Sequence, residues 1–313
     1  MFFSETDLIA GIASRAKYPS SVVKGIGDDT AVLKSADPDK YQLFTQDSIV
    51  LNQHFFLKDD PQAIGWKAYA RNVSDIAAMG GIPSCALVAL GLPKSLDEGW
   101  VTRLYDGIFS CADTFSCPVV GGDITAVVNE LFVSVSMIGV VSKQKLCLRN
   151  GAKPGNMVCV TGLLGGSIRS KHLNFMPRLR EAQWLVNNVH ITSMIDLSDG
   201  LAKDLFHIGE ASSVGFELNK SEIPISSDAV SLAAETGKAP IWHALNDGED
   251  FELLFTVADN ESDLKSVFAE FQDLFGFRCS VIGRVTDQAG GAFIVDEKNR
   301  RGQLFPGGFD HFA

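Results

Sequence analysis

The sequence contains little positive charge. It has 27 Lys and Arg residues against 38 Asp and Glu residues, which gives a formal net charge of -11 over 313 residues. The longest basic stretch, at 298–301, is typical of a solvated turn. A nucleic-acid partner is therefore not expected, because binding to a phosphate backbone needs Lys and Arg gathered on one surface. An acidic protein that binds a phosphorylated ligand must obtain positive charge from another source, and metal ions are the obvious one.

Long apolar runs and paired cysteines are also missing. No apolar stretch reaches the length of a membrane span, and the first residues do not show a basic segment followed by an apolar one. The six cysteines have no C-x-x-C spacing, and most lie in apolar runs, where a free Cys behaves as a small hydrophobic residue. We therefore expect a cytoplasmic protein that is neither secreted nor embedded in a membrane.

The common nucleotide-binding motifs are absent. The sequence has no G-x-x-x-x-G-K-[ST] loop, no G-x-G-x-x-G after a strand, and no protein-kinase catalytic-loop or D-F-G pair. These absences exclude the common kinase folds. The glycine-rich segment 161–167 follows a predicted strand, but a plain strand-to-helix connection is the better interpretation of it.

Hydrophobic periodicity predicts a chain of two parts. In the first part we expect an amphipathic helix capped by Ser4, strands at 41–50 and 131–141, and helices at 61–79 and 96–115. A turn-rich break follows at 149–155. After it, strands and helices alternate at 157–161, 193–197, 201–211, 251–257, 261–271 and 279–285. The predicted fold class is a two-domain α+β / α/β protein, with a mixed-sheet domain at 1–148 and an α/β domain at 149–313.

What the sequence does contain is a series of Gly-Asp segments at the ends of predicted strands. They occur at 25–29, 121–125, 195–201 and 246–252. Each one alone is close to ordinary turn chemistry, since Asp side chains cap turns and helices. Carboxylates brought together repel by on the order of 4 kcal/mol per pair at about 4 Å, and metal ions would remove that cost. If these segments converge, they predict a multi-metal phosphate site.

Two further positions are singled out by the period of their elements. On the strand 41–50, Thr45 and Asp47 share one face, which makes either a hard oxygen pair suited to Mg²⁺ or an exposed polar face. Asp75 lies within a predicted helix of small residues. Its partner is either Arg71, one turn earlier on the helix, or a metal ion.

Taken together, eight ordered segments resemble the thiamine-monophosphate kinase family, which belongs to the superfamily of aminoimidazole ribonucleotide synthetase. They span nearly the whole chain and lie at 25–33, 45–55, 72–81, 121–125, 149–155, 195–204, 248–254 and 307–312. The resemblance implies an aminoimidazole ribonucleotide synthetase-like fold and a homodimer in which the first domain binds ATP and metal and dimerises. It also implies ATP-dependent phosphorylation of thiamine monophosphate to thiamine diphosphate, by direct in-line transfer with several Mg²⁺ ions.

The resemblance also implies roles for residues, position by position. The metal ligands would be Asp29, Thr45, Asp47, Asp75, Asp123, Asp196 and Asp199. Contacts to ATP would come from Tyr105, Gly122, Asp123, Arg149 and Ser198, and the thiamine moiety would be held by His54, Glu249 and Phe309. The residues expected to act directly in catalysis are Asp75, Asp123 and Asp199. An acid and an aromatic ring suit a cationic thiazolium. Gln46 departs from the small hydroxyl residue frequent in the family and is left out of the site.

Two other interpretations stay open. The first is another ATP-using enzyme of the superfamily. Selenophosphate synthetases would show a reactive Cys near the N-terminus and the hydrogenase-maturation relative a C-terminal Cys, whereas here the first Cys is Cys85 and the sequence given ends in Phe312 and Ala313. The second is a non-catalytic nucleotide-binding dimer, which would have no use for a thiamine-binding set.

Overall fold

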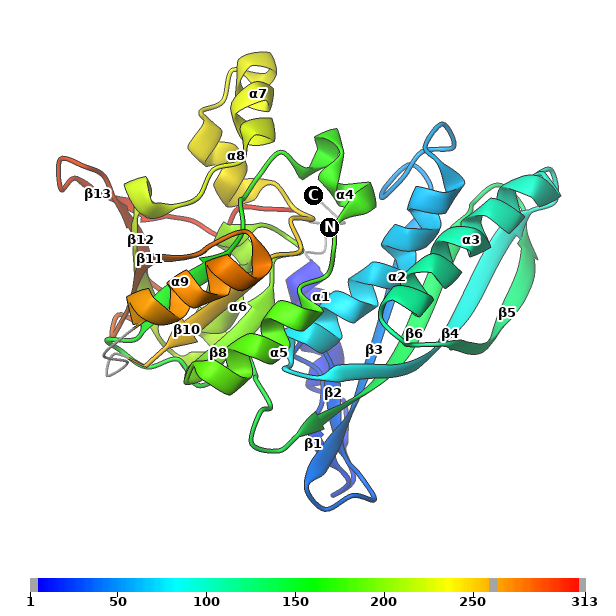
Figure 1. The fold of residues 1–313 in the computed structure, drawn as a ribbon, viewed down its shortest axis with the longest axis horizontal. Coiled ribbons are helices and arrows are strands. Elements are labelled where there is room, and N and C mark those ends of the chain that lie inside the picture. The colour runs from blue at the N-terminus through cyan, green and yellow to red at the C-terminus, as the bar shows by residue number, and fades with distance from the viewer. Residues whose placement is uncertain (1–4, 259–263, 310–313) are drawn as a thin grey trace.

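The computed structural model describes residues 5–258 and 264–309. Three predictions fall outside these ranges: the Ser4 cap, the start of the helix at 261–263, and residues 310–312 of the resemblance. The described chain forms two β-sheets that lie next to each other, each combined with helices (Figure 1). The predicted class of two sheet-and-helix parts is confirmed. The boundary at 148/149 stays a prediction.

The first sheet has six strands in the order β1-β2-β3-β6-β4-β5. Its pairs are antiparallel except for β4 with β5, which is parallel. On β3 the alternation expected from the sequence is present, since Leu43 and Ile49 are buried while Gln46 and Ser48 on the other face are exposed. The strands are β1 (Val22–Lys24), β2 (Ala31–Lys34), β3 (Lys40–Val50), β4 (Ile82–Pro93), β5 (Val119–Val127) and β6 (Phe132–Ser142).

Helices α2 (Pro61–Ala78) and α3 (Glu98–Thr114) cover one face of this sheet (Figure 1). Helix α2 begins at Pro61, where the missing N–H costs nothing, and Asp60 caps it by accepting a hydrogen bond from the Gln62 N–H. It is buried along most of its length, because it also contacts β8 (Ile191–Asp196), α4 (Lys171–Asn174) and α5 (Leu179–Asn188) of the second half. Helix α2 therefore carries its polar residues to the contact between the halves.

The second sheet has seven strands in the order β13-β12-β9-β11-β7-β10-β8. The alternation of strands and helices does not produce the parallel sheet typical of α/β layouts, because only β9 and β12 pair in parallel. Except for β12 and β13, strands that follow each other in the chain are not neighbours in the sheet, and β10, for example, lies between β7 and β8. The strands are β7 (Met157–Thr161), β8 (Ile191–Asp196), β9 (Gly215–Asn219), β10 (Leu253–Val257), β11 (Cys279–Thr286), β12 (Ala292–Val295) and β13 (Arg301–Leu304).

Helices cover both faces of the second sheet. Helix α6 packs on one face against a core that includes Val160 and Leu254. Helices α5 and α9 pack on the other face against a core that includes Phe255 and is continuous with that of the first half. The second-half helices are α4 (Lys171–Asn174), α5 (Leu179–Asn188), α6 (Leu201–Ser212), α7 (Ser227–Thr236), α8 (Pro240–Asn246) and α9 (Leu264–Phe275).

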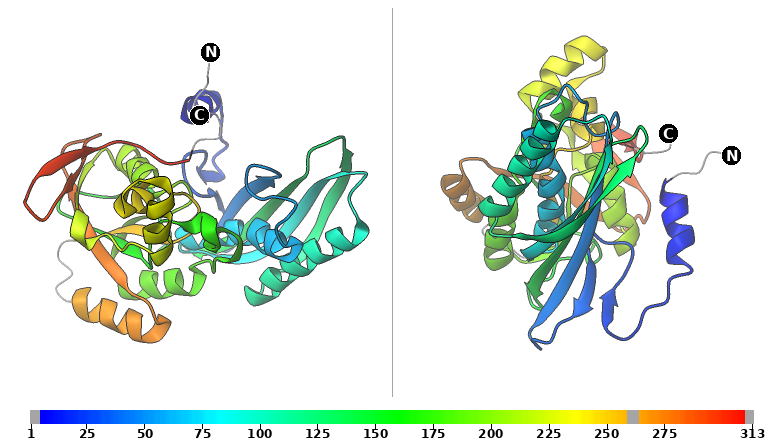
Figure 2. Two further views of the ribbon diagram at one scale, coloured as in Figure 1. Left: turned by 90° about the horizontal axis from the view of Figure 1, so that it is seen from above. Right: turned by 90° about the vertical axis from the view of Figure 1, so that its right-hand side faces the viewer.

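The first helix, α1 (Glu5–Ala13), stands away from both sheets (Figure 2). None of its residues is buried. Among all the described helices, none combines the length and the apolar character needed to cross a membrane.

Candidate active site

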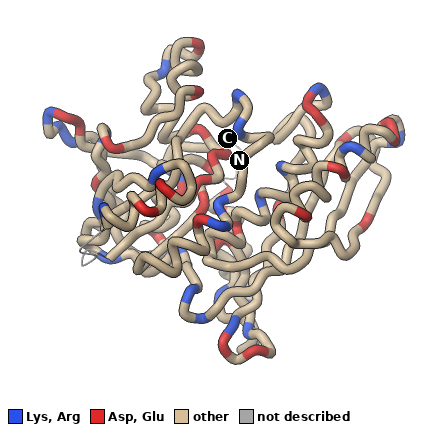
Figure 3. The backbone as a smooth tube through the Cα atoms, viewed as in Figure 1, with Lys and Arg blue, Asp and Glu red and all other residues tan. Residues whose placement is uncertain are grey.

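Acidic side chains gather where the two halves meet. Figure 3 shows acidic positions through the middle of the molecule. From the first half, β3 contributes Thr45 and Asp47 on the face that α2 covers, and α2 contributes Asp75. The Thr45 hydroxyl donates a short hydrogen bond to the Asp75 carboxylate. The predicted common face of Thr45 and Asp47 is therefore present, and it faces inward.

Asp75 does not pair with Arg71, which was the alternative raised by the sequence. Arg71 instead donates from Nε to Asp47 Oδ2 at 2.8 Å and from Nη1 to Glu249 Oε1 at 3.3 Å. Asp75 faces β3, and Arg71 reaches past it to two other carboxylates.

The turn before β2 adds Asp28 and Asp29. The Arg149 guanidinium donates to Asp29 Oδ1 from Nε at 3.2 Å and from Nη2 at 2.5 Å. Asp28 accepts the Arg149 backbone N–H at 3.1 Å and lies 3.6 Å from Lys24 Nζ. The second oxygen of Asp29, Oδ2, is buried without a hydrogen-bond partner. Arg149, expected to contact ATP, thus holds one expected metal ligand in place.

The end of β8 completes the acidic cluster from the second half. Asp196 is buried there, and its Oδ2 accepts a hydrogen bond from Ser74 Oγ at 2.5 Å. Ser74 precedes Asp75 on α2, so neighbouring residues of one helix contact both halves of the site. We call Asp29, Asp47, Asp75 and Asp196 the acidic cluster.

Burial and mutual repulsion perturb this cluster. Burial is the largest cause that raises the pKa of Asp29, Asp75 and Asp196, and for Asp196 the pKa reaches about 7. The pKa of Asp75 is raised further by the charges of Asp47, Asp196 and Asp29. Carboxylates that repel one another in a dry site are stabilised in their charged form by a cation.

The acidic cluster fits Mg²⁺ by its chemistry. It offers hard oxygen donors, together with the Thr45 hydroxyl, and it includes the unpartnered buried Oδ2 of Asp29. Its carboxylates are not all packed around one point, however. Among the described residues, the group whose ligand atoms all lie within 4.8 Å of one another is Asp199, Asp204 and His207. An ion that keeps several water ligands, as Mg²⁺ does, suits the wider spacing.

Asp204 and His207 extend the site beyond the residues expected from the sequence. They lie three apart on α6, so they share a face of that helix, and Asp204 accepts the Asp199 backbone N–H at 3.1 Å. Burial lowers the pKa of His207 to about 4, which keeps its imidazole neutral at pH 7. Both residues lie on the helix that directly follows the segment 195–201, on one face of it. This spacing could have identified them from the sequence.

Beside the acidic residues lies a cavity of about 210 Å³. It brings together the three residues expected to hold thiamine, His54, Glu249 and Phe309, and two further expected residues, Ser198 and Asp199. The rings of His54 and Phe309 are 6.4 Å apart, centroid to centroid. The other lining residues, which were not expected from the sequence to line a binding site, are Gln53, Arg71, Ser167, Ile168, Asp247 and Gly248.

Glu249 occupies a strained backbone position. Its φ of 63° lies in the left-handed region, which a non-glycine residue adopts only when the surroundings hold it. Its N–H donates to the Ser198 carbonyl at 2.7 Å, and its Oε2 accepts from Lys67 Nζ at 2.7 Å. Lys67 also donates to the His54 carbonyl at 2.7 Å. One buried lysine therefore positions two of the residues that line the cavity.

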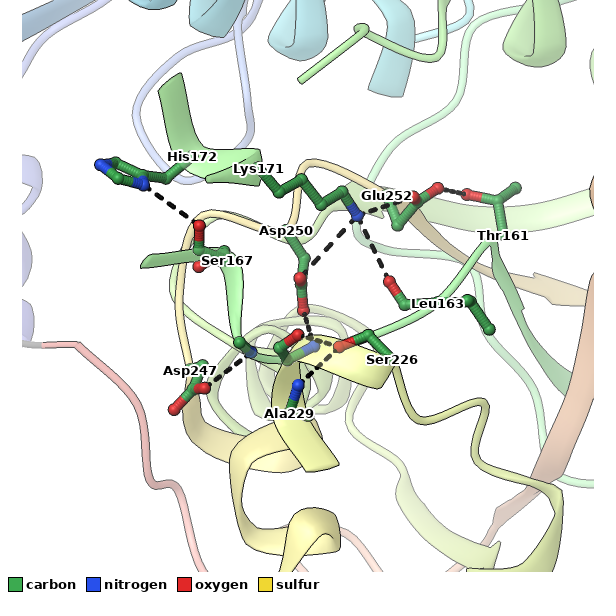
Figure 4. A network of polar contacts seen from close by, with 12 residues as sticks. Thr161, Leu163, Ser167, Lys171, His172, Ser226, Ala229, Asp247, Asp250 and Glu252 are labelled. Atoms are coloured by element: carbon green, nitrogen blue, oxygen red, sulfur yellow. Dashed lines mark hydrogen bonds and ion pairs between the residues drawn. The ribbon is translucent and has the colours of Figure 1, made fainter. Parts of the chain in front are cut away.

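The glycine-rich segment 161–167 packs against the acidic turn that carries Glu249 (Figure 4). The Gly165 N–H donates to Asp250 Oδ2 at 2.7 Å, and the Gly166 N–H donates to Asp247 Oδ2 at 2.8 Å. These donors are already satisfied within the protein, so the segment does not present them to a phosphate. Ser167 at its end nevertheless reaches the cavity.

Three expected residues, Tyr105, Gly122 and Asp123, do not join the site within one chain. Asp47 lies in register with Val135, Val88 and Gly122 across the sheet, which places Gly122 three strands away, or about 14 Å. Asp123 is in register with Ser48, so its side chain is on the opposite face from Asp47. Tyr105 lies on α3, where its ring packs against Phe109.

The expectation that segment 121–125 lies at the end of a strand is wrong, because these residues lie within strand β5. The glycine at 122 is explained by packing. A Cβ there would lie 1.8 Å from the Val88 carbonyl oxygen of β4, so only glycine fits the close approach of the two strands. A Gly-Gly-Asp sequence is compatible both with a turn and with a closely packed edge strand, so the sequence alone does not distinguish the two.

Comparison with known proteins identifies both halves. Residues 27–141 match the family model "AIR synthase related protein, N-terminal domain", and residues 139–296 match the corresponding C-terminal domain. A curated thiamine-monophosphate kinase of Rhodopirellula baltica is 36% identical over 315 residues, covering 98% of this chain and 97% of the relative. The enzyme of that name from Escherichia coli K12 is 35% identical, covering 100% and 99%.

Solved structures agree with the sequence comparison. The structure described as "AaThiL complexed with AMPPCP and TMP" superposes with a TM-score of 0.83 at 30% identity, over 99% of this chain and 97% of the other. The hydrogenase maturation protein HypE in complex with ATP is only 18% identical, with a TM-score of 0.72, so it shares the fold. On the full-length similarity to its relatives, the chain belongs to the thiamine-monophosphate kinase family of AIR synthase related proteins.

Proposed function

We propose that this protein transfers the γ-phosphoryl group of ATP to thiamine monophosphate, forming thiamine diphosphate and ADP. The observation that carries the proposal is the cavity in which His54, Glu249 and Phe309 meet beside Asp199 and close to the acidic cluster. A carboxylate and an aromatic ring suit the cationic thiamine rings, and the relative solved with AMPPCP and TMP binds both kinds of ligand.

The transfer is direct and in line. An oxygen of the acceptor phosphate attacks the γ-phosphorus, a P–O bond forms, and the bond from the γ-phosphorus to the β–γ bridging oxygen breaks, so that ADP leaves. Several Mg²⁺ ions, when bound, neutralise the phosphate charges, and Asp29, Thr45, Asp47, Asp75, Asp196 and Asp199 would hold them. Arg149 and Ser198 would contact ATP. The protein's own task is to position the two phosphates, since little covalent chemistry is required of it.

A second copy of the chain would supply the missing Tyr105, Gly122 and Asp123, in a homodimer. The sheet face opposite α2 supports this proposal, since no helix in the described part of the chain covers it and it includes exposed apolar side chains, with Phe44 36% and Leu87 49% exposed. Asp123 lies on this face at the edge strand β5, next to the surface that a partner sheet would cover.

A cytoplasmic location agrees with the state of the thiols. The six cysteines are all free, and all but Cys85 are buried. Free buried thiols are typical of proteins that fold in a reducing compartment.

The proposed function is tested by measuring ADP release from ATP with thiamine monophosphate, with and without Mg²⁺, and by identifying thiamine diphosphate as the product. Turnover that needs both the acceptor and Mg²⁺ supports the proposal. ADP release at the same rate with and without thiamine monophosphate would point to another ATP-using activity of the superfamily. ATP binding without turnover would point to a non-catalytic dimer.

A further inference from the structure

Arg71 lies between the two parts of the site. Its guanidinium contacts Asp47, in the acidic cluster, through Nε at 2.8 Å, and Glu249, in the thiamine cavity, through Nη1 at 3.3 Å. The side chain is 12% exposed and lines the cavity. Only these two of its N–H groups have a hydrogen-bond partner among the described residues.

The charge of the cavity gives Arg71 a distinctive role. Three carboxylates, Asp199, Asp247 and Glu249, line the cavity, and Arg71 is the only Arg or Lys among its described lining residues. A phosphate monoester that enters such a cavity carries up to two negative charges and needs a cation on the protein side. The guanidinium fork matches the geometry of phosphate oxygens, which a lysine ammonium does not.

Lys67 makes it possible for Arg71 to change partners. The Lys67 side chain is fully buried, and it holds Glu249 through Oε2 while Arg71 contacts Oε1. Glu249 would therefore stay paired if Arg71 turned toward a ligand. The long Arg71–Glu249 contact is the weaker of the two, because hydrogen bonds to charged groups are strongest at about 2.7–2.9 Å.

A buried pair of aromatic rings lies beside Arg71. Its guanidinium carbon is 5.9 Å from the centre of the Phe251 ring, which is stacked on Phe175 with a centroid distance of 3.8 Å. Both rings are buried. A cation supported on a fixed aromatic face loses little further freedom when it binds an anion.

We propose that Arg71 binds the phosphate group of the acceptor and holds it between the thiamine pocket and the acidic cluster. This inference rests on the proposed function, and it adds a residue that neither the sequence motifs nor the implied family roles include. Its consequence is specificity: Arg71 distinguishes thiamine monophosphate from thiamine, which lacks the phosphate.

The test compares the dissociation constants of thiamine monophosphate and thiamine for the full-length protein with Mg²⁺, by isothermal titration calorimetry. The ratio of the two constants measures discrimination by the phosphate. In Arg71→Gln we expect this ratio to fall about tenfold or more, because a charge-assisted hydrogen-bond pair is lost. Arg71→Lys, which keeps the charge but not the fork, should lower it about threefold and decides the matter if the glutamine variant does not fold.

Two controls separate binding from structure. Phe309→Ala, which removes part of the cavity wall that both ligands share, should weaken both ligands in proportion and leave the ratio unchanged. Arg300→Gln, on the exposed turn where Arg300 pairs with Asp296, should change neither constant. An unchanged ratio in the folded Arg71 variants overturns this inference while leaving the proposed function intact. A wild-type protein that neither binds nor phosphorylates thiamine monophosphate overturns both.

Discussion

At the residue level, the site is built from buried polar and charged groups that satisfy one another between different elements. Arg149 with Asp29, Arg71 with Asp47 and Ser74 with Asp196 are pairs in which a first-half residue meets a partner from another element. Such pairs are costly to leave incomplete in a dry site. Asp29, Asp47 and Asp196 are therefore positioned before any ion arrives, and the arginines are the groups that must shift when ions and phosphates bind.

Asp75→Asn tests the central carboxylate. Because the substitution removes one negative charge at the place where metal-bound phosphates would meet, we expect kcat to fall on the order of 100-fold or more. The melting temperature without metal should not fall, since repulsion within the acidic cluster is relieved. Steady-state kinetics and thermal unfolding measure the two effects, with Asp273→Asn on the exposed face of α9 as control. Near-normal kcat would remove Asp75 from the catalytic set.

Phe309→Ala tests the aromatic wall of the cavity. Loss of the ring should raise KM for thiamine monophosphate about fivefold or more and leave KM for ATP unchanged, because a cation–π contact and apolar contact area are lost on one substrate only. Phe305→Ala is the matched control, since Phe305 is more exposed and does not line the cavity. An equal change for both substrates would argue against a contact with thiamine.

At the level of helices and strands, the turn at 247–252 and strand β5 show that similar Gly-Asp sequences have different roles. In the turn at 247–252, Glu249 faces the cavity, while Glu252 is buried against Lys171 and Arg178. In β5, the glycines permit close strand packing instead of forming a turn. The surrounding elements decide which acid is free to act.

Asp250 gives this turn a dependence on pH. Burial raises the pKa of Asp250 from 3.8 to about 7. Between these values the folded protein holds a proton that the unfolded chain has released, so the free energy of unfolding decreases as pH rises from about 4 to 7. Asp250→Asn removes this contribution. Denaturant unfolding at pH 5 and pH 8 should therefore show the variant gaining stability relative to wild type at the higher pH. An equal difference in the free energy of unfolding between variant and wild type at the two pH values would contradict the raised pKa of Asp250.

Alanine substitutions at two adjacent glycines, Gly121 and Gly122, test the close packing of β5 against β4. Gly122→Ala should lower the free energy of unfolding by about 1–3 kcal/mol, because its Cβ would meet the Val88 carbonyl at 1.8 Å. Gly121→Ala should cost less, since its nearest neighbour is the Leu87 side chain at 3.2 Å. Equal effects in urea unfolding would mean that the strands can separate freely.

At the scale of the whole molecule, one chain does not bring all the expected residues together. The acidic cluster and the thiamine cavity lie between the halves, while Asp123 is on the far edge and the opposite face of the first sheet. If two copies pack through that face, each site would combine the acidic cluster of one chain with Asp123 of its partner.

Mixed dimers test this arrangement. Asp75→Asn and Asp123→Asn homodimers should each be nearly inactive. In a heterodimer of the two variants, one site loses both carboxylates and the other regains both, so random mixing should restore about one quarter of wild-type activity. Activity is measured on the co-expressed mixture, and heterodimers purified from it should have about one half of wild-type activity. No recovery in verified heterodimers would place Asp123 in the site of its own chain or outside the site.

Local patterns in the sequence were sufficient to predict several features. The inward face of Thr45 and Asp47 followed from the period of a strand, and the limits of α2 and α3 followed from their hydrophobic patterns and end signals. The choice between Arg71 and a metal for Asp75 could not be made this way, because it depends on a strand thirty residues earlier in the chain.

Tertiary structure alone decided which acids share a site. The aspartates at 29, 75 and 196 are brought together by the packing of α2 against both halves, and the register of four strands carries Asp123 away from them. Burial, which sets the pKa of these carboxylates and leaves Asp29 Oδ2 without a partner, exists only in the assembled fold. Residue types, and the face of each helix or strand on which they lie, can be read from local sequence. Distances between elements, and therefore the site, came from long-range contacts that no local pattern encodes.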